Sequence, residues 1–190
     1  LAILNDQVVP EAALANYQAP APTTNEQGET EESAFADTEK QLAGIGAIII
    51  DEWTQDLDLL DKLRTGFGKT AQVHSVLVSE EKREVGEKYK DYFDHSESLA
   101  RLPNHRLLAM LRGRQDNVLA IQIEGEDAPF MEQIERQFGL TDVQPTERQS
   151  FLQGLAKKLW QDKWRPHIEH RLLTEKRLAA EAAAIDVFAN

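Results

Sequence analysis

One stretch of the chain concentrates residues that can do chemistry: DYFDHSESLARLPNHRLLAMLRGR, residues 91–114. It holds two histidines, four arginines and two aromatic residues. Histidine serves as an acid, a base or a metal ligand near neutral pH, and clustered arginines bind phosphate groups. Three interpretations follow, namely a catalytic cluster, a nucleic-acid contact and a helix with an ordinary polar face.

The distribution of charge is compatible with the second interpretation. Residues 101–115 contain four arginines and no acidic residue, whereas residues 18–61 contain eleven acidic residues and one lysine. A local excess of arginine is typical of phosphate contacts or of docking to an acidic neighbour. Pairing with the acidic helices of the same chain is an equally good explanation. The residues predicted to contact nucleic acid are Arg101, His105, Arg106, Arg112 and Arg114.

A second basic run follows in residues 145–180, with eight lysines and arginines against four acidic residues. The whole chain of 190 residues nevertheless has a formal net charge of −12. This balance argues against uniform attraction to phosphate, so any nucleic-acid surface must be a local patch.

Two other motifs are weak candidates for chemistry. GFGKT, residues 66–70, resembles the end of a phosphate-binding loop, but it closes a predicted helix and lacks the required earlier glycine at Leu63. HIEH, residues 167–170, places two histidines on one helix face, yet a zinc site needs further ligands and no HExxH pattern is present. The sequence therefore predicts no enzyme activity, no metal and no cofactor.

Composition restricts the class of protein further. The chain contains no cysteine, which excludes disulfides, thiolate nucleophiles and Cys-ligated zinc. Its longest apolar run, residues 47–50, is far shorter than the ~20 residues of a membrane-spanning helix. We expect a cytoplasmic protein without a membrane partner. Because the chain begins at Leu1 rather than methionine, we also expect it to be a fragment of a longer polypeptide.

The elements that must position the arginines can be predicted from periodicity. Pro103 suits the first turn of a helix that ends at Gly113, with an apolar face formed by Leu107, Leu108 and Leu111. Alternating or β-branched residues predict strands at residues 72–78 and 118–123. A charged helix is expected between them at residues 80–89.

Elsewhere the pattern is helical. Amphipathic helices are predicted on either side of a break at residues 54–56, with Asp56 as an N-cap, and a short helix is predicted to stop at Gly139. A long helix follows residue 146, with a bend expected near Pro166.

These elements predict a mainly α (α+β) fold, a helical bundle-like body with a small two-stranded sheet and a long C-terminal helix. The predicted organisation is a helical remnant at 1–17, an acidic Pro/Thr-rich linker at 18–37, a helical domain at 38–144 and a helical spine at 145–190.

The string EKYKDYFDHSESLARLPNHRLLAMLRGRQDNVLAIQI closely resembles a segment of the bacterial Tex family of transcription accessory proteins. TEKRLAAEAAAIDVFAN is similar to the Tex stretch that leads into the RNase H-like (YqgF) domain. The resemblance covers most of the chain. Three residues depart from the family pattern, since Ser98 stands where proline is expected, Leu107 where alanine is expected and Asn117 where glycine is expected.

The resemblance implies a multidomain cytoplasmic protein that binds RNA or DNA and acts with the transcription machinery. It implies that this chain is a non-catalytic scaffold from the N-terminal half, preceding the RNase H-like domain. The alternative is an interaction module, whose arginines dock neighbouring domains or a protein partner and which has no nucleic-acid affinity of its own.

Overall fold

The computed structural model describes residues 23–24, 30–31, 37–142 and 145–189. The helix predicted at residues 1–17 lies outside the described residues, as does most of the linker predicted at 18–37. Within the described part, two short strands, β1 (Thr23–Thr24) and β2 (Thr30–Glu31), pair antiparallel.

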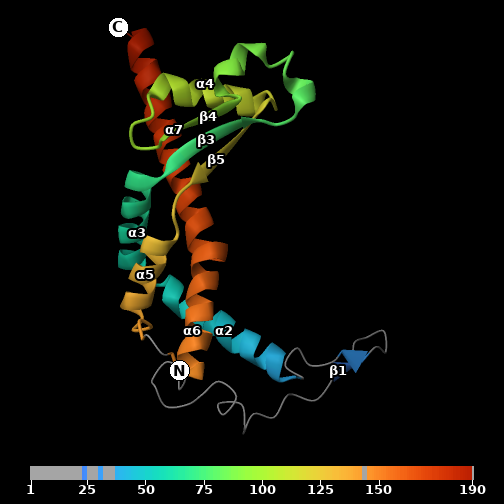
Figure 1. Cartoon of the computed structure of the whole chain (residues 1–190), viewed down its shortest axis with the longest axis vertical. Coiled ribbons are helices and arrows are strands. Elements are labelled where there is room, and N and C mark those ends of the chain that lie inside the picture. Colours follow the sequence, from blue (N-terminus) through green and yellow to red (C-terminus); the bar gives the residue numbers. More distant parts are fainter. Residues whose placement is uncertain (1–22, 25–29, 32–36, 143–144, 190) are drawn as a thin grey trace. The chain divides into compact units, whose positions relative to one another are not determined.

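In the remaining elements, three strands are interspersed among helices along the chain (Figure 1). The α-helices are α2 (Thr38–Thr54), α3 (Leu57–Thr70), α4 (Asn104–Gln115), α5 (Ala128–Gln137), α6 (Glu147–Lys158) and α7 (Arg165–Ala189). The strands are β3 (Gln72–Leu77), β4 (Asp94–Ser98) and β5 (Leu119–Glu124). Short 3₁₀ segments occupy η1 (Glu80–Lys82) and η2 (Glu87–Tyr92), where one charged helix was predicted, and a π-helical segment, η3, occupies Leu159–Trp164.

The chain divides into two compact units. The first contains the described residues up to Leu59 together with Met131–Asp162. The second contains Leu60–Phe130 and the described residues from Lys163 onward.

The first unit is built on α2 and α6. The side chain of Asp37 caps α2 by accepting a hydrogen bond from the Lys40 amide at 2.7 Å. Trp53, at the end of α2, stacks on Phe138 with ring centroids 4.3 Å apart. Gly46 allows α2 to approach α6 closely, because a Cβ there would lie 2.8 Å from Leu155 Cδ2.

Two local predictions in the first unit are confirmed. Asp56 caps α3 by accepting a hydrogen bond from the Leu59 amide at 2.9 Å. Gly139, which follows α5, has a φ of +67°, in the left-handed region that glycine adopts without a steric penalty.

The second unit contains a three-stranded antiparallel sheet in the order β4-β3-β5, with α4 packed against it (Figure 1). The predicted fold class is therefore wrong in its sheet, which has three strands rather than two, and the fold is mainly α. The strand that was missed is β4, with the sequence DHSES. It lacks the β-branched and aromatic residues that mark strands in a sequence, and it is fixed by antiparallel pairing of Asp94–Ser98 with β3.

The C-terminal end of α4 differs from the prediction. The helix continues through Gly113 to Gln115. Gly113 is buried against β5, where a Cβ would lie 2.5 Å from Leu119 Cδ1, so its role is close packing rather than termination. Asn117 instead adopts the left-handed conformation after the helix, with a φ of 56°. Asparagine tolerates this region better than most residues.

The long C-terminal helix α7 follows a π-helical turn. A bend was predicted near Pro166, and η3 ends two residues before it, at Trp164. Proline has no amide hydrogen, so it cannot donate to the carbonyl group four residues earlier, which belongs to Asp162. Proline is a usual cause of local irregularity in helices, which fits the π-helical turn just before it.

Candidate nucleic-acid interface

Helix α4 carries most of the predicted site residues, and its buried face fixes their directions. Leu107, Met110 and Gly113 are buried within the second unit. The spacing of three residues places them on one face of the helix. Among the arginines of this helix, Arg112 and Arg114 are exposed and Arg106 is partly buried.

Arg106 is held by a carboxylate of the sheet. Its Nη1 donates a hydrogen bond to Oε2 of Glu97 on β4 at 2.9 Å, and the same oxygen lies 3.3 Å from Nε2 of His95. The guanidinium of Arg106 lowers the pKa of the Glu97 carboxyl below its ordinary value, with a smaller contribution from His95. This contact removes Arg106 from the set of available cations.

Arg112 and Arg114 line a cavity of about 540 Å³ between α4 and α7. Five of the seven lining side chains are polar or charged. The lining residues are Leu108, Leu111, Arg112, Arg114, Gln115, Arg177 and Glu181.

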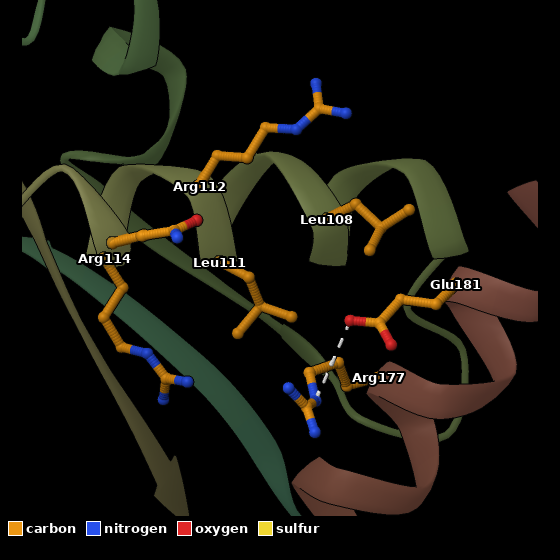
Figure 2. A pocket seen from close by; sticks show the side chains of 7 residues that line it. Leu108, Leu111, Arg112, Arg114, Arg177 and Glu181 are labelled. Atoms are coloured by element: carbon orange, nitrogen blue, oxygen red, sulfur yellow. Dashed lines mark ion pairs between the residues drawn. The ribbon is translucent and has the colours of Figure 1, made fainter.

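Figure 2 shows how these side chains are arranged. Leu111 lies between the guanidinium groups of Arg114 and Arg177, whereas Arg112 points away from α7. Nε of Arg177 lies 3.9 Å from Oε1 of Glu181, a distance at the outer limit of an ion pair. Within the part of the chain that the structure describes, Arg112 and Arg114 have no carboxylate at ion-pair distance. The cavity thus has two guanidinium groups, one on either side of Leu111, and one carboxylate at the outer limit of an ion pair.

Arg101 and His105 occupy other positions in the second unit. Both are exposed, and neither lines the cavity. Neither makes an ion pair among the described residues. The five predicted residues therefore form no single surface: two line the cavity, one is paired with Glu97, and two are exposed elsewhere.

Sequence reasoning missed the contribution of α7 to this site. Arg177 belongs to the basic run at residues 145–180, so its charge was visible in the sequence. Its position opposite Arg114 depends on the packing of α4 against α7. A pattern of local spacing contains no information about contact between distant helices.

The GFGKT motif has a packing role. Gly66 and Gly68 lie inside α3, which continues to Thr70. A Cβ at Gly66 would lie 3.1 Å from Phe130 Cε1, and one at Gly68 would lie 3.0 Å from Leu172 Cδ2. The glycines allow neighbouring side chains to approach the helix.

The histidines of the HIEH motif, His167 and His170, are exposed on α7. No group of three His, Asp or Glu residues suited to a metal ion occurs among the residues that the structure describes. In the same residues, no helix combines the length and the hydropathy needed to cross a membrane.

His74 makes a different ionic contact, on the central strand β3. Its Nδ1 lies 2.9 Å from Oε1 of Glu124 on β5, and its Nε2 lies 3.2 Å from Oδ1 of Asp94 on β4. These two hydrogen bonds, Glu124 first, raise the pKa of His74 above its ordinary value. The contact joins all three strands of the sheet.

Comparison with known proteins places the chain in a family. A family model described as "Tex central region-like" matches residues 5–188. Protein YhgF of Escherichia coli (strain K12) is 35% identical over 165 residues, which cover 83% of this chain and 21% of that protein.

Two further relatives carry the Tex name. Transcriptional accessory protein Tex of Neisseria gonorrhoeae is 33% identical over 156 residues, covering 80% of this chain and 20% of that protein. Protein tex of Bordetella pertussis is 32% identical over 200 residues, covering 99% of this chain and 24% of that protein. The chain thus spans about a fifth to a quarter of the length of these relatives. The resemblance found in the sequence is confirmed, and the chain belongs to the Tex family through its Tex central region-like sequence.

Proposed function

We propose that this chain is a non-catalytic scaffold within a cytoplasmic transcription accessory factor that binds RNA or DNA. In this proposal the exposed and cavity-lining arginines of the second unit supply an accessory contact to phosphate, beside the contacts that the rest of the protein makes with nucleic acid or the transcription machinery. The name of the Neisseria gonorrhoeae relative, transcriptional accessory protein Tex, supports the role in transcription.

The observation that carries the proposal is the state of the arginines. The chain has an acidic excess of twelve charges, yet Arg101, Arg112 and Arg114 have no ion-pair partner among the described residues. Cations without a carboxylate partner bind a phosphate backbone without first breaking an internal contact. Arg106, which is paired with Glu97, is not expected to contribute.

Fluorescence anisotropy of the full 190-residue chain with labelled single-stranded RNA and duplex DNA tests this proposal. The decisive variant is a triple substitution, Arg101→Ala, Arg112→Ala and Arg114→Ala. Three lost contacts to single-stranded RNA correspond to a change of about 2 in the slope of log affinity against log salt, or roughly 20-fold in affinity between about 50 and 200 mM salt.

A matched control removes the same charge elsewhere. Arg83, Arg136 and Arg171 each have a carboxylate partner, at 2.6, 2.6 and 3.2 Å. Replacing these three by alanine should change the salt slope much less than the decisive variant. Equal losses of affinity in the two triple variants would show that the effect depends on net charge alone. Absence of binding by the folded wild-type chain at low salt would instead make the arginines docking points for a protein or a neighbouring domain.

A further inference from the structure

We propose that the cavity between α4 and α7 binds one nucleotide unit of a single-stranded nucleic acid. Its phosphate would bind the guanidinium groups of Arg114 and Arg177, which flank Leu111, and its base would lie against Leu108 and Leu111. This inference rests on the proposed function and assigns to one site a ligand of defined chemistry. It also adds residues of α7 to a site that the sequence assigned to the stretch at residues 101–114.

The charges of the cavity suit one phosphate group. The guanidinium groups of Arg114 and Arg177 flank Leu111 (Figure 2), and guanidinium forms two parallel hydrogen bonds with phosphate. Among the described residues, Arg177 contacts one carboxylate, that of Glu181, and this contact is 3.9 Å long, so Arg177 remains available. A phosphate oxygen would provide a shorter and stronger partner than this carboxylate.

The apolar residues indicate more than a phosphate site. Leu108 and Leu111 are three residues apart on α4, so they lie on one helix face, and both line the cavity. A bound inorganic phosphate would leave this apolar surface in water, whereas a base would cover it with an aromatic face. Gln115, which also lines the cavity, has an amide that both donates and accepts hydrogen bonds, as the edge of a base does.

The size of the cavity favours a nucleotide over an extended acidic peptide. Its volume of about 540 Å³ falls in the range of roughly 300–1,000 Å³ that is typical of small-molecule sites. An extended peptide needs a longer groove with repeated pockets. The described lining belongs to two turns of α4 and one of α7 and is limited to a single compact hollow.

Substitution of Glu181 provides an independent test of the proposal. Its carboxylate faces the cavity opposite Leu111 (Figure 2), where it would repel a phosphate and compete for Arg177. The variant Glu181→Gln removes the repulsion at a half-exposed side chain, so it should not disturb folding. We expect it to increase nucleotide affinity several-fold, which no damaged or unfolded variant would do.

Isothermal titration of the 190-residue chain with three probes provides the test: adenosine 5′-monophosphate, ribose 5-phosphate and inorganic phosphate. We expect adenosine monophosphate to bind most tightly, and Arg114→Ala or Arg177→Ala to reduce its affinity by about tenfold each. Lys176→Ala is the matched control, because it removes one positive charge beside Arg177 without lining the cavity; its effect should stay within about twofold.

Leu111→Gln separates a nucleotide site from an anion site. It should weaken binding of adenosine monophosphate while leaving the affinity for inorganic phosphate unchanged. Equal affinities for the three probes, or equal effects of Arg177→Ala and Lys176→Ala, would overturn the proposal. A hexanucleotide of adenosine should displace adenosine monophosphate and bind more tightly; failure to displace it would also overturn the assignment to a strand.

The outcomes distinguish this inference from the proposed function. Salt-dependent RNA binding that is lost in the triple arginine variant but retained in Arg177→Ala and Leu111→Gln would leave the proposed function standing and refute the nucleotide site. Loss of binding in all of these variants would support both. Circular dichroism of each variant would confirm that the helices are retained.

Discussion

The two sides of α4 place chemically identical side chains in different surroundings. On the side of β4, Arg106 is joined to Glu97 at 2.9 Å. On the side of α7, Arg114 lines a cavity whose one carboxylate, Glu181, lies 3.9 Å from a different arginine. The position of a single acidic residue thus decides whether an arginine stabilises the fold or remains available for a ligand.

This difference teaches that a count of charges is a poor guide to a binding site. A half-exposed ion pair such as Arg106–Glu97 contributes about 0–1 kcal/mol to stability, but a phosphate must replace it to bind. An arginine without a carboxylate partner can bind phosphate without the loss of an ion pair. The availability of each cation therefore matters more than the number of cations in the stretch.

The largest expected effect comes from the buried face that supports both sides. Leu107 is fully buried, so Leu107→Ala should lower the free energy of unfolding by about 2–5 kcal/mol, as measured by urea unfolding. Both the Glu97 contact and the cavity should be lost with it. The matched control is Leu178→Ala on α7, where the side chain is 54% exposed; a similar loss in the control would contradict this account of α4.

A smaller effect is expected where α4 ends on the cavity side. Asn117 has a φ of 56°, and the left-handed conformation costs roughly 1–2 kcal/mol for most residues but less for glycine and asparagine. Asn117→Ala should therefore destabilise the chain by about 1 kcal/mol, whereas Asn117→Gly should be neutral or slightly stabilising.

Hydrogen exchange can localise the effect of Asn117→Ala. The amides of Asp116 and Asn117 donate to the carbonyl groups of Arg112 and Arg114, so exchange should accelerate in the last turn of α4, next to the cavity. The first turn, next to Arg106, should be unaffected. Uniform acceleration along the helix would show that Asn117 supports the whole element rather than its end.

The features that the sequence predicted are those set by neighbouring residues. The Asp56 cap needs only an amide three residues away, and Gly139 needs only its own backbone conformation. Strand β4 escaped prediction because its sequence has no strand preference, and it is held by pairing with β3. Gly113 was misread as a helix end because its packing against Leu119 belongs to the tertiary structure.

The same distinction applies to the candidate site. The arginines at 112 and 114 were identified from their local excess of charge, and they do line one cavity. Glu97, whose carboxylate pairs with Arg106, lies on β4, the strand that was not predicted. Arg177, which lines the cavity opposite Arg114, lies on α7. Both facts depend on contacts that are distant in the chain, which spacing cannot encode.

The comparison between the two sides of α4 can be tested by making them alike. Glu97→Gln removes the carboxylate that holds Arg106, at a cost of about 1 kcal/mol or less in the free energy of unfolding. It should steepen the salt slope for single-stranded RNA by about 0.7, the value for one added phosphate contact. The affinity for adenosine monophosphate should not change. The same substitution in an Arg106→Ala background should produce no gain, and a gain there would assign the effect to net charge.

The smallest effect concerns His74, an ionic contact of the sheet that we expect to serve stability alone. Glu124, with Asp94 second, raises the pKa of His74 in the folded chain, so its stabilisation is complete below the unfolded value of about 6.5. It is lost as pH rises through the higher folded value. Urea unfolding should therefore show a loss of under ~1 kcal/mol between about pH 6 and pH 8.5.

Two substitutions decide whether this pH dependence belongs to His74. In His74→Gln the loss between the two pH values should shrink, because the group that titrates is gone, while RNA affinity should stay at the wild-type value. His105→Gln, at an exposed position of α4, should keep the wild-type pH dependence. If His74→Gln weakened RNA binding as much as Arg114→Ala, the part of the sheet around His74 would have to be included in the interface, and the division between a structural and a binding side of α4 would fail.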